Sequence, residues 1–397
     1  MNFQGKRILL GVSGSIAAYK AAELARKLVA AGAAVRVVMT RAAMEFVGPI
    51  TFQTLTGARV GTGLWGGESE PLDHISLGQE VDAIVLAPAT ANLLGKMAAG
   101  IGDDLLTTVL LAATKPVLVC PAMNTEMWRH PAVRENLARL KARGLTVMEP
   151  EAGELACGTV GPGLLPDAQI ILEALAALMT PQDLAGRRLL VTAGPTHEDL
   201  DPVRFLTNRS SGKMGYALAL VGRRRGAEVC LVSGPTVLDQ PYGVERVMVR
   251  AAVEMKDAVM ARFPQADALL MAAAVSDYRP DSSHPLKIKR GRQELELRLV
   301  QNPDILKELR SLKKNQVVVG FAAETHDMEA EARRKMADKG LDLIVANDVS
   351  RLDAGFAVDT NEVTVIHRKG RLERFPLLPK EEVAEKILDL VAELLGQ

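Results

Sequence analysis

Cysteine, aromatic residues and net charge are all scarce in this 397-residue chain. Its three cysteines are scattered and include no C-x-x-C pair, which argues against a disulfide framework and a zinc knuckle and favours a reducing compartment. An aromatic fraction of 4% offers little material for stacking single-stranded nucleic acid, and 48 basic residues balance 48 acidic ones. We therefore expect no nucleic-acid partner and no attraction to anionic membranes.

The N-terminus also lacks a long hydrophobic run. The apolar stretch from Ile8 is soon interrupted by glycine and serine, so it is too short for a signal sequence or a membrane span. We expect a cytoplasmic protein. The composition, 48% apolar and 24% charged, is ordinary for a globular protein, and the length suggests two or three domains.

The order of the apolar runs predicts the fold class. Short β-rich runs alternate with helical stretches, as in the βαβ units of open parallel sheets. In the first half we expect strands at residues 7–13, 35–40, 83–87 and 117–120, and helices at 16–31 and 98–113. After a helix at 168–179, we expect strands at 188–192, 228–233, 268–272, 317–321 and 342–346, then a β-hairpin at 361–375. The prediction is an α/β protein with two Rossmann-like doubly wound domains.

Three loops in the first half follow strands directly, at the edge where open α/β sheets bind ligands. Gly11 and Gly14 let a ligand approach the backbone. They precede a helix whose free N–H groups favour an anion such as a phosphate, although their spacing is not that of the dinucleotide fingerprint. A plain tight turn is an equal alternative for this loop. Residues 87–92 and 121–124 each add an amide side chain. Either loop alone is better explained as a polar turn, whereas the three together favour a binding site.

Two further residues are candidates for chemistry. His74 is solitary, and such a histidine is more often structural or exposed than catalytic. Cys157 lies in the glycine-rich segment 153–163, which could open and close over a ligand, whereas Cys120 and Cys230 lie on expected strands. The residues alone leave both a structural and a chemical role open for His74 and Cys157.

Between residues 14 and 158 the chain resembles the homo-oligomeric flavin-containing cysteine decarboxylases, and among them phosphopantothenoylcysteine decarboxylase. The matching segments are 14–20, His74, 87–92, 121–128 and 153–158, and the Pro-x-Met-Asn-x-x-Met-Trp pattern of 121–128 is the most specific. The resemblance implies a flavodoxin-like flavoprotein domain at 1–180 that forms trimers and binds FMN between subunits. The FMN contacts that it implies are Gly14, Ser15, Ile16, Thr40, Pro88, Ala89, Thr90 and Asn92.

The same resemblance gives roles to three catalytic residues. Loss of CO2 from a cysteinyl carboxylate needs an electron sink, which oxidation of the neighbouring thiol-bearing carbon to a thioaldehyde provides. By resemblance, Asn124 binds the carboxylate and Cys157 later protonates the enethiolate carbon. His74 corresponds to the active-site histidine of the family, which orients the substrate or accepts the thiol proton.

In the second half, residues 207–215 lead into a helix and superficially suggest a phosphate loop. They depart from the Walker pattern, because Thr207 replaces the first glycine and Met214 follows Lys213. Ser210 and Ser211 are candidates to cap the helix, and with Asn208 they also suit an anionic ligand.

Asp277 follows a later strand, and a basic cluster lies at 286–290. Basic runs usually lie on solvated faces, but lysines also offset the charge of a nucleotide triphosphate, and a carboxylate can hold Mg2+.

Most of residues 187–350 resembles the bacterial, CTP-using phosphopantothenate–cysteine ligases. The resemblance implies a ligase domain at 187–397 that forms dimers, with Asn208 and Lys287 as catalytic residues and Asp277 as the Mg2+ ligand. Its implied nucleotide contacts are Asp277, Lys287, Lys289, Pro303, Asp304, Ile305, Phe321, Lys335 and Lys339.

The two resemblances together predict consecutive steps of coenzyme A biosynthesis. In the second domain, 4'-phosphopantothenate would attack CTP to give an acyl-cytidylate, and cysteine would displace CMP to form 4'-phosphopantothenoylcysteine. The first domain would decarboxylate that product to 4'-phosphopantetheine. One alternative is a nicotinamide or flavin oxidoreductase, against which the missing dinucleotide fingerprint argues. The other is a non-catalytic flavin-binding regulator, against which the combination of His74, Asn124 and Cys157 argues.

Overall fold

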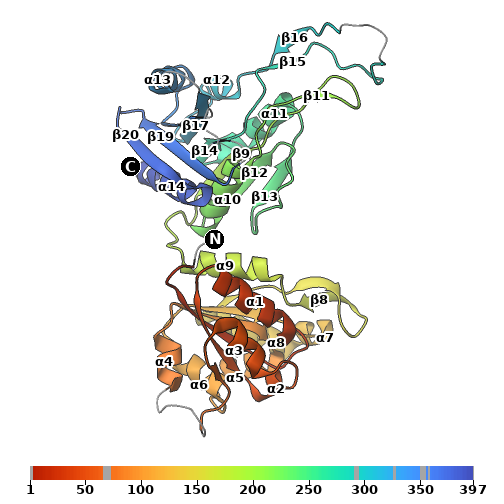
Figure 1. Cartoon of the computed structure of the whole chain (residues 1–397), viewed down its shortest axis with the longest axis vertical. Helices are drawn as coiled ribbons and strands as arrows, with labels where there is room; N and C mark the ends of the chain where they lie inside the picture. The colour runs from red at the N-terminus through yellow and green to blue at the C-terminus, as the bar shows by residue number, and fades with distance from the viewer. Residues whose placement is uncertain are drawn as a thin grey trace. The chain divides into compact units, whose positions relative to one another are not determined.

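The protein consists of two compact α/β units in a computed structural model that describes residues 3–65, 73–289, 295–324, 328–348, 355 and 358–396. The first unit comprises Met1–Thr180 and the second Pro181–Gln397 (Figure 1). Each is built on a sheet with a parallel core and helices on both faces. The predicted fold class is therefore confirmed. No helix in the described ranges combines the length and apolarity needed to cross a bilayer.

The sheet of the first unit is entirely parallel and has the strand order β3-β2-β1-β4-β5-β6. Its strands are β1 (Arg7–Val12), β2 (Ala34–Met39), β3 (Val60–Gly61), β4 (Ala83–Ala89), β5 (Val117–Pro121) and β6 (Thr146–Val147). Every residue of β4 is buried, as expected for a strand covered on both faces. The strand order reverses between β1 and β4, which is the place where doubly wound sheets open a crevice for ligands.

Helices of the first unit cover both faces of this sheet. One face packs against α1 (Ala18–Ala30), α3 (Pro49–Thr56) and α9 (Ala168–Met179). The other packs against α4 (Asp73–Gln79), α5 (Ala91–Ala99), α6 (Leu105–Ala112) and α8 (Pro131–Ala142). The short helices α2 (Arg41–Met44) and α7 (Thr125–Arg129) follow β2 and β5 directly.

The single helix predicted at 98–113 is wrong, because the structure has two helices there. Gly100 ends α5 in the left-handed conformation, with φ of 72°. Asp104 then begins α6 with a capping box, in which its side chain accepts a 2.8 Å hydrogen bond from the Thr107 N–H. The alanine- and leucine-rich composition on both sides concealed this break.

The second unit has an eight-stranded sheet with the order β13-β12-β9-β14-β17-β18-β19-β20. Its strands are β9 (Arg188–Ala193), β12 (Glu228–Ser233), β13 (Glu245–Met248), β14 (Ala268–Met271), β17 (Val317–Glu324), β18 (Leu343–Asp348), β19 (Thr360–His367) and β20 (Leu372–Pro379). The strands from β13 to β18 are parallel, and β19 and β20 form the predicted antiparallel hairpin at the edge. The strand order reverses between β9 and β14.

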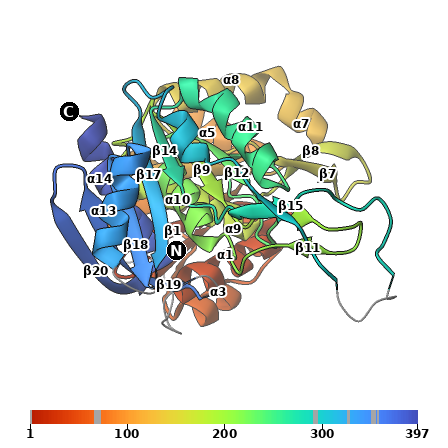
Figure 2. The ribbon, with the colours of Figure 1, turned by 90° about the horizontal axis from the view of Figure 1, so that it is seen from above.

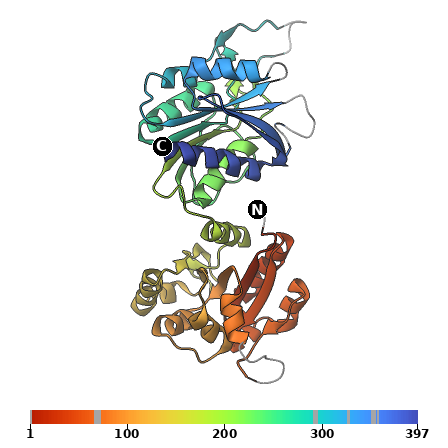
Figure 3. The ribbon, with the colours of Figure 1, turned by 90° about the vertical axis from the view of Figure 1, so that its left-hand side faces the viewer.

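The helices of the second unit also form two layers. On one face lie α10 (Lys213–Arg224) and α14 (Lys380–Leu395), and on the other α11 (Ala252–Arg262), α12 (Ile305–Leu309) and α13 (Met328–Lys339). Figure 3 shows α13, in lighter blue, and α14, in dark blue, on opposite faces. Two small antiparallel pairs stand apart from the main sheet, namely β10 (Glu198–Asp199) with β11 (Phe205–Leu206) and β15 (Tyr278–Pro280) with β16 (Leu299–Gln301). The chain around β15 extends away from the main sheet (Figures 1 and 2).

Candidate functional sites

A pocket of about 800 Å³ in the first unit opens where β1, β2, β4 and β5 end. The loops that follow these strands line it, so the structure brings together the loops that the sequence predicted. Of the predicted residues, those that line the pocket are Gly14, Ser15, Thr40, Thr90, Asn92 and Asn124.

Hydroxyl groups fix these loops, two of them as helix caps and one as a link between neighbouring loops. Thr40 accepts a hydrogen bond from the Ala43 N–H and so caps α2. Thr90 caps α5 in the same way. Ser13, which sequence analysis missed, donates to the Pro88 carbonyl at 2.7 Å and accepts from the Thr90 N–H at 3.0 Å. The only sequence signal for Ser13 was a small polar residue directly after a strand.

Gly14 is required for packing within the chain. A Cβ atom at this position would lie 2.4 Å from Cβ of Ala42, a distance that real Cβ atoms do not reach. Glycine therefore allows the loop after β1 to pack against the start of α2. Gly14 also lines the pocket, so its contact with a ligand stays a prediction beside this packing requirement.

Five predicted residues of the first unit do not line this pocket, namely Ile16, His74, Pro88, Ala89 and Cys157. The Ile16 side chain is 58% exposed, Ala89 is fully buried, and the Pro88 carbonyl accepts the Ser13 hydrogen bond. His74 lies on α4, on the opposite side of the unit from β8 (Figure 1). One copy of the chain therefore does not bring His74 together with Asn124 and Cys157.

Asn124 and Cys157 do meet. The segment around Cys157 is a hairpin of β7 (Glu151–Glu154) and β8 (Val160–Leu164), and Cys157 lies in its turn, where the Gly158 N–H donates to the Leu155 carbonyl at 2.8 Å. The Asn124 Nδ2 donates to Cys157 Sγ at 3.2 Å, and Sγ lies 3.1 Å from Thr159 Oγ1. The thiol is exposed, so a substrate can reach it.

A second glycine fixes this hairpin beside Asn124. Gly163 has φ of 153°, and a Cβ atom there would lie 2.1 Å from the Met123 carbonyl oxygen. The Met123 N–H also donates to the Gly163 carbonyl at 3.0 Å. Because only glycine permits this approach, β8 lies directly against the loop after β5 and carries Cys157 to its partner. The glycine-rich segment is therefore a hairpin whose strand β8 is hydrogen-bonded to the loop after β5.

The surroundings of Cys157 favour loss of its proton. The Thr159 hydroxyl lowers the pKa of the thiol most, and the Thr159 backbone and the Asn124 amide lower it further, whereas burial has a small opposing effect. Burial instead raises the pKa of Cys120 and Cys230. Cys157 is therefore the cysteine best suited to release a proton.

We predict that Thr159→Val raises the pKa of Cys157, because it removes the hydroxyl with the largest influence. Alkylation by iodoacetamide near pH 7 should then slow several-fold, since the thiolate is the reactive form. The rate is measured against pH, with mass spectrometry to identify the modified cysteine. Thr54→Val, which removes an exposed hydroxyl on α3, is the matched control. If the pH at which the alkylation rate is half-maximal is the same in Thr159→Val as in the original protein, the effect of Thr159 on the pKa of Cys157 is contradicted.

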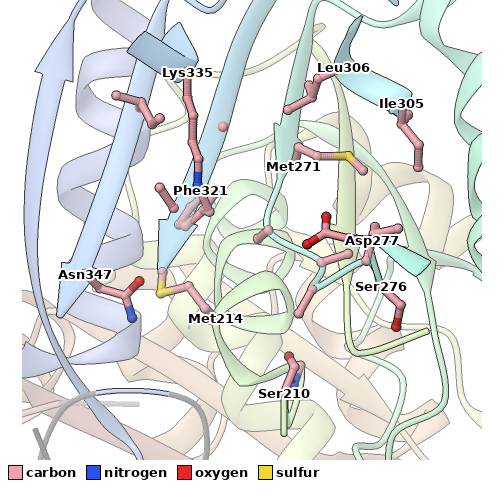
Figure 4. A pocket seen from close by; sticks show the side chains of 18 of the residues that line it. Ser210, Met214, Met271, Ser276, Asp277, Ile305, Leu306, Phe321, Lys335 and Asn347 are labelled. Carbon is pink, nitrogen blue, oxygen red and sulfur yellow. The ribbon is translucent and has the colours of Figure 1, made fainter. Parts of the chain in front are cut away.

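The second unit holds a pocket of about 340 Å³ at the end of β14, lined also by the start of α10, by α12 and α13, and by β17 and β18. Figure 4 shows Asp277 and Ser276 on one side, Asn347 and Met214 on the other, and Lys335 reaching toward Phe321. The predicted nucleotide-contacting residues that line it are Asp277, Pro303, Asp304, Ile305, Phe321, Lys335 and Lys339. Sequence analysis missed Asn347, Asn361 and Lys380 in the same lining.

Hydrogen bonds fix the acidic side of this pocket. Asp304 caps α12 and lies 3.3 Å from Lys339 Nζ. The Asn302 side chain donates to the Ser276 carbonyl at 2.8 Å, which holds the loop that carries Asp277. Within the described ranges, no group of three or more His, Cys, Asp or Glu residues could form a metal cage.

The start of α10 faces the pocket without a side-chain cap. Its N-cap residue is Gly212, so the expectation that Ser210 or Ser211 caps the helix is wrong; Ser210 Oγ instead accepts a 3.3 Å hydrogen bond from the Gly212 N–H. The Asn208 amide ties this loop to the sheet, because Nδ2 donates to the Ala274 carbonyl and Oδ1 accepts from the Ser210 N–H. The uncapped helix start is favourable for an anion.

Lys287 and Lys289 are exposed and do not line the pocket. Asp201, which is buried and was missed by sequence analysis, anchors the segment between them: its carboxylate accepts from the Ile288 N–H at 3.1 Å, and Arg204 donates to the Ile288 carbonyl. Burial alone would raise the pKa of Asp201, but the N–H groups of Ile288, Val203 and Arg204 and the Arg204 charge lower it to about 2.

The depressed pKa of Asp201 sets the pH range over which it stabilises the unit. An unfolded aspartate has a pKa near ~3.9, so the stabilisation is fully present above that pH and is lost as the pH falls toward about 2. The carboxylate is therefore ionised at neutral pH, and the Lys287–Lys289 segment stays attached.

We predict that Asp201→Asn loosens this basic segment, because an amide cannot accept all the hydrogen bonds that the carboxylate accepts. Trypsin should cleave after Lys287 or Lys289 roughly tenfold faster in the variant, and mass spectrometry identifies the cleavage sites. Cleavage after Lys369, in the exposed turn between β19 and β20, is the internal control and should not change. Equal cleavage of the basic segment in both proteins would contradict the anchoring role.

Each of the two α/β units has a pocket at the ends of its parallel strands, which is the arrangement of a protein with two separate ligand sites. The family model for flavoproteins matches residues 2–180. The model for the C-terminal domain of DNA/pantothenate metabolism flavoproteins matches residues 184–395. These matches cover both units.

Relatives match over the whole length. The coenzyme A biosynthesis bifunctional protein CoaBC of Vibrio parahaemolyticus is 47% identical over 98% of this chain and 99% of its own length. CoaBC of Bacillus subtilis is 47% identical over 99% of this chain and 98% of its own length. CoaBC of Escherichia coli is 45% identical over 98% of this chain and 97% of its own length. The chain belongs to the CoaBC family of bifunctional coenzyme A biosynthesis proteins. It is therefore an enzyme with a decarboxylase and a ligase activity, which leaves the oxidoreductase and regulator alternatives without support.

Proposed function

We propose that residues 1–180 form an FMN-dependent decarboxylase of 4'-phosphopantothenoylcysteine. We further propose that residues 187–397 form the ligase that makes this substrate from 4'-phosphopantothenate, cysteine and CTP. The observation that carries the decarboxylase assignment is the 3.2 Å contact between Asn124 Nδ2 and Cys157 Sγ, because Asn124 also lines the first pocket. One chain would then catalyse two consecutive steps.

The first pocket suits FMN in size and in lining. Its volume of about 800 Å³ is within the usual range for cofactor sites, and it lies at the strand ends where α/β sheets bind phosphate-bearing groups. The match to the flavoprotein family model supports this cofactor. When bound, FMN would supply reversible two-electron chemistry: two electrons taken from the thiol-bearing carbon would let the electrons left by CO2 delocalise to sulfur, and the same two electrons would return to the substrate after CO2 has left, to give the thiol product. The residues that would hold it are Gly14, Ser15, Thr40, Thr90 and Asn92.

Asn124 and Cys157 would act on the substrate itself. The Asn124 Oδ1 accepts a 2.8 Å hydrogen bond from the Glu126 N–H, which directs Nδ2 toward Cys157 and makes it available to a substrate carboxylate. The Cys157 thiol would give its proton to the carbon from which CO2 has departed, and its lowered pKa makes that transfer easier. Because Cys157 is exposed, water can then restore its proton.

A homo-oligomer would give His74 a place in this site. Since α4 lies across the unit from β8, His74 of one copy would reach Asn124 and Cys157 of another copy in the expected decarboxylase trimer. There its imidazole would orient the substrate or accept the thiol proton.

In the ligase unit, the nucleotide would occupy the second pocket, with its phosphates near the uncapped start of α10. The carboxylate of 4'-phosphopantothenate would attack the α-phosphate of CTP, and Lys335 and Lys339 would offset negative charge, with Asp277 available to Mg2+. Asn208 keeps one unused lone pair and one unused N–H, which can bind the acyl group while the cysteine amine displaces CMP. The expected ligase dimer would give the exposed Lys287 and Lys289 access to a pocket of the other copy.

We predict that Cys157→Ser blocks only the second reaction. The variant should form 4'-phosphopantothenoylcysteine from 4'-phosphopantothenate, cysteine, CTP and Mg2+ at the rate of the original protein, but its yield of 4'-phosphopantetheine should fall at least a hundredfold, because a hydroxyl is a far weaker acid than this thiol. Products are identified by mass.

Cys230→Ser is the matched control, since Cys230 lies on β12 and outside both pockets. A parallel reaction with ATP tests the choice of nucleotide. Normal 4'-phosphopantetheine formation by Cys157→Ser would remove Cys157 from the mechanism, and formation of neither product by the original protein would refute the proposed function.

A further inference from the structure

The loop after β9, residues 194–196, contacts two walls of the ligase pocket. The Gly194 carbonyl accepts a 2.9 Å hydrogen bond from the Ala274 N–H, which belongs to the loop after β14. On the side of α10, a Cβ atom on Gly212 would lie only 3.3 Å from Gly194 Cα. The loop therefore connects the two walls, although none of its residues lines the pocket.

Thr196 connects this loop to the wall that carries Asp277. It is 0% exposed, and its Oγ1 accepts a 3.0 Å hydrogen bond from the Ser276 N–H. Ser276 directly precedes Asp277, and both residues line the pocket (Figure 4). A carboxylate is positioned only as precisely as the backbone that carries it, so the Thr196 hydroxyl helps to determine where the Asp277 carboxylate lies.

The backbone of Thr196 makes a second connection, to the loop that carries Asn208. The Thr196 carbonyl accepts a 2.9 Å hydrogen bond from the Thr207 hydroxyl, and Thr207 directly precedes Asn208. Thr207 stands where the Walker pattern has its first glycine. Here a hydroxyl group anchors the loop at that position.

The two hydrogen bonds can be removed separately. One uses the side chain of Thr196 and the other uses its carbonyl, so Thr196→Val leaves the acceptor for Thr207 in place. Each loop also keeps a further attachment: the Asn302 side chain donates to the Ser276 carbonyl, and the Asn208 amide donates to the Ala274 carbonyl. Loss of one hydroxyl should therefore displace a loop without unfolding the unit.

We propose that Thr196 and Thr207 are positioning residues for two different steps of the ligase reaction. Thr196 serves activation of the substrate carboxylate, because it acts on Asp277 through the Ser276 peptide. Thr207 serves transfer of the acyl group to cysteine, because it acts on Asn208 through the backbone. This inference rests on the proposed ligase function. Neither threonine lines the pocket, so neither hydroxyl acts by touching the reactants.

The two steps make and break different bonds. In the first, the carboxylate oxygen bonds to the α-phosphorus of CTP, and pyrophosphate leaves with the electron pair of the broken P–O bond. In the second, the cysteine nitrogen bonds to the acyl carbon, CMP leaves with the electron pair of the broken C–O bond, and the nitrogen releases a proton to water. The first step can be followed without cysteine, which allows each step to be timed by itself.

Rapid quenching of the full chain tests the proposal. Pyrophosphate release is timed with 4'-phosphopantothenate, CTP and Mg2+, and cysteine is then added to time amide formation, counted by mass as 4'-phosphopantothenoylcysteine plus 4'-phosphopantetheine. Thr196→Val should slow pyrophosphate release about tenfold and leave amide formation from the acyl-cytidylate unchanged. Thr207→Val should do the reverse. Equal slowing of both steps by either variant would overturn the proposal, as would unchanged rates in both variants.

Conservative variants separate positioning from general damage. Thr196→Ser and Thr207→Ser keep the hydroxyls and should restore the step that the valine variant slows, whereas failure to restore it would overturn the role of that hydroxyl. Thr236→Val and Ser311→Ala are the matched controls. They remove hydroxyls of the same unit that bond to Tyr216 and to the Glu308 carbonyl outside the pocket, and they should change neither step.

Amide hydrogen exchange supplies a measurement that does not depend on turnover. Thr196→Val should speed exchange several-fold in peptides that cover 274–277, and Thr207→Val in peptides that cover 208–212, because each loop loses an anchor. Unchanged exchange in both would overturn the proposal. If the original protein consumes CTP and the valine variants do not separate the two steps, the positioning roles are wrong and the ligase assignment stands. If it consumes no CTP, the ligase assignment is wrong and the two roles fall with it, even where exchange shows that the hydroxyls hold their loops.

Discussion

The common direction of the parallel strands is the constraint on which both sites depend. Parallel strands end at one edge of a sheet, so loops far apart in sequence meet there. In the first unit this edge collects the loops that contain Ser13, Thr40, Thr90 and Asn124, and two hydrogen bonds join the Ser13 hydroxyl to the loop that contains Thr90. In the second it places the start of α10 beside the loop after β14, where the Asn208 amide joins them.

The residues that sequence analysis located best lie in loops that directly follow a strand. Thr40, Thr90 and Asn124 are such residues, and their strands were visible as apolar runs. Contacts that depend on distant pairing were not visible. Asp201 binds a backbone group 87 residues away, and Asn361 reaches the ligase pocket only through the antiparallel register of β18 and β19. Resemblance to known families suggested chemistry for His74 and Lys287, but neither resemblance nor spacing could say that they lie away from the pockets of their own chain.

Gly14 and Gly163 are required because a side chain at either position would collide with another part of the chain, which the sequence alone does not show. For Gly14, whose contact with a ligand stays a prediction, the atom that a side chain would strike is Cβ of Ala42. Gly163 belonged to a segment expected to open and close, yet it lets β8 lie against the Met123 carbonyl and so determines which residue faces Asn124. In both cases the chain packs against itself so closely that only glycine fits, and this packing positions the polar groups around the site.

The place of Lys380 at the start of α14 has a consequence for how the protein is made. Residues up to 180 contain the whole first unit, so it can fold on the ribosome while the rest is still being translated. The second pocket takes part of its wall from residue 380 of 397, so it stays open on one side until nearly the whole chain has emerged. The half of the enzyme that would act second is thus the half that matures first during synthesis.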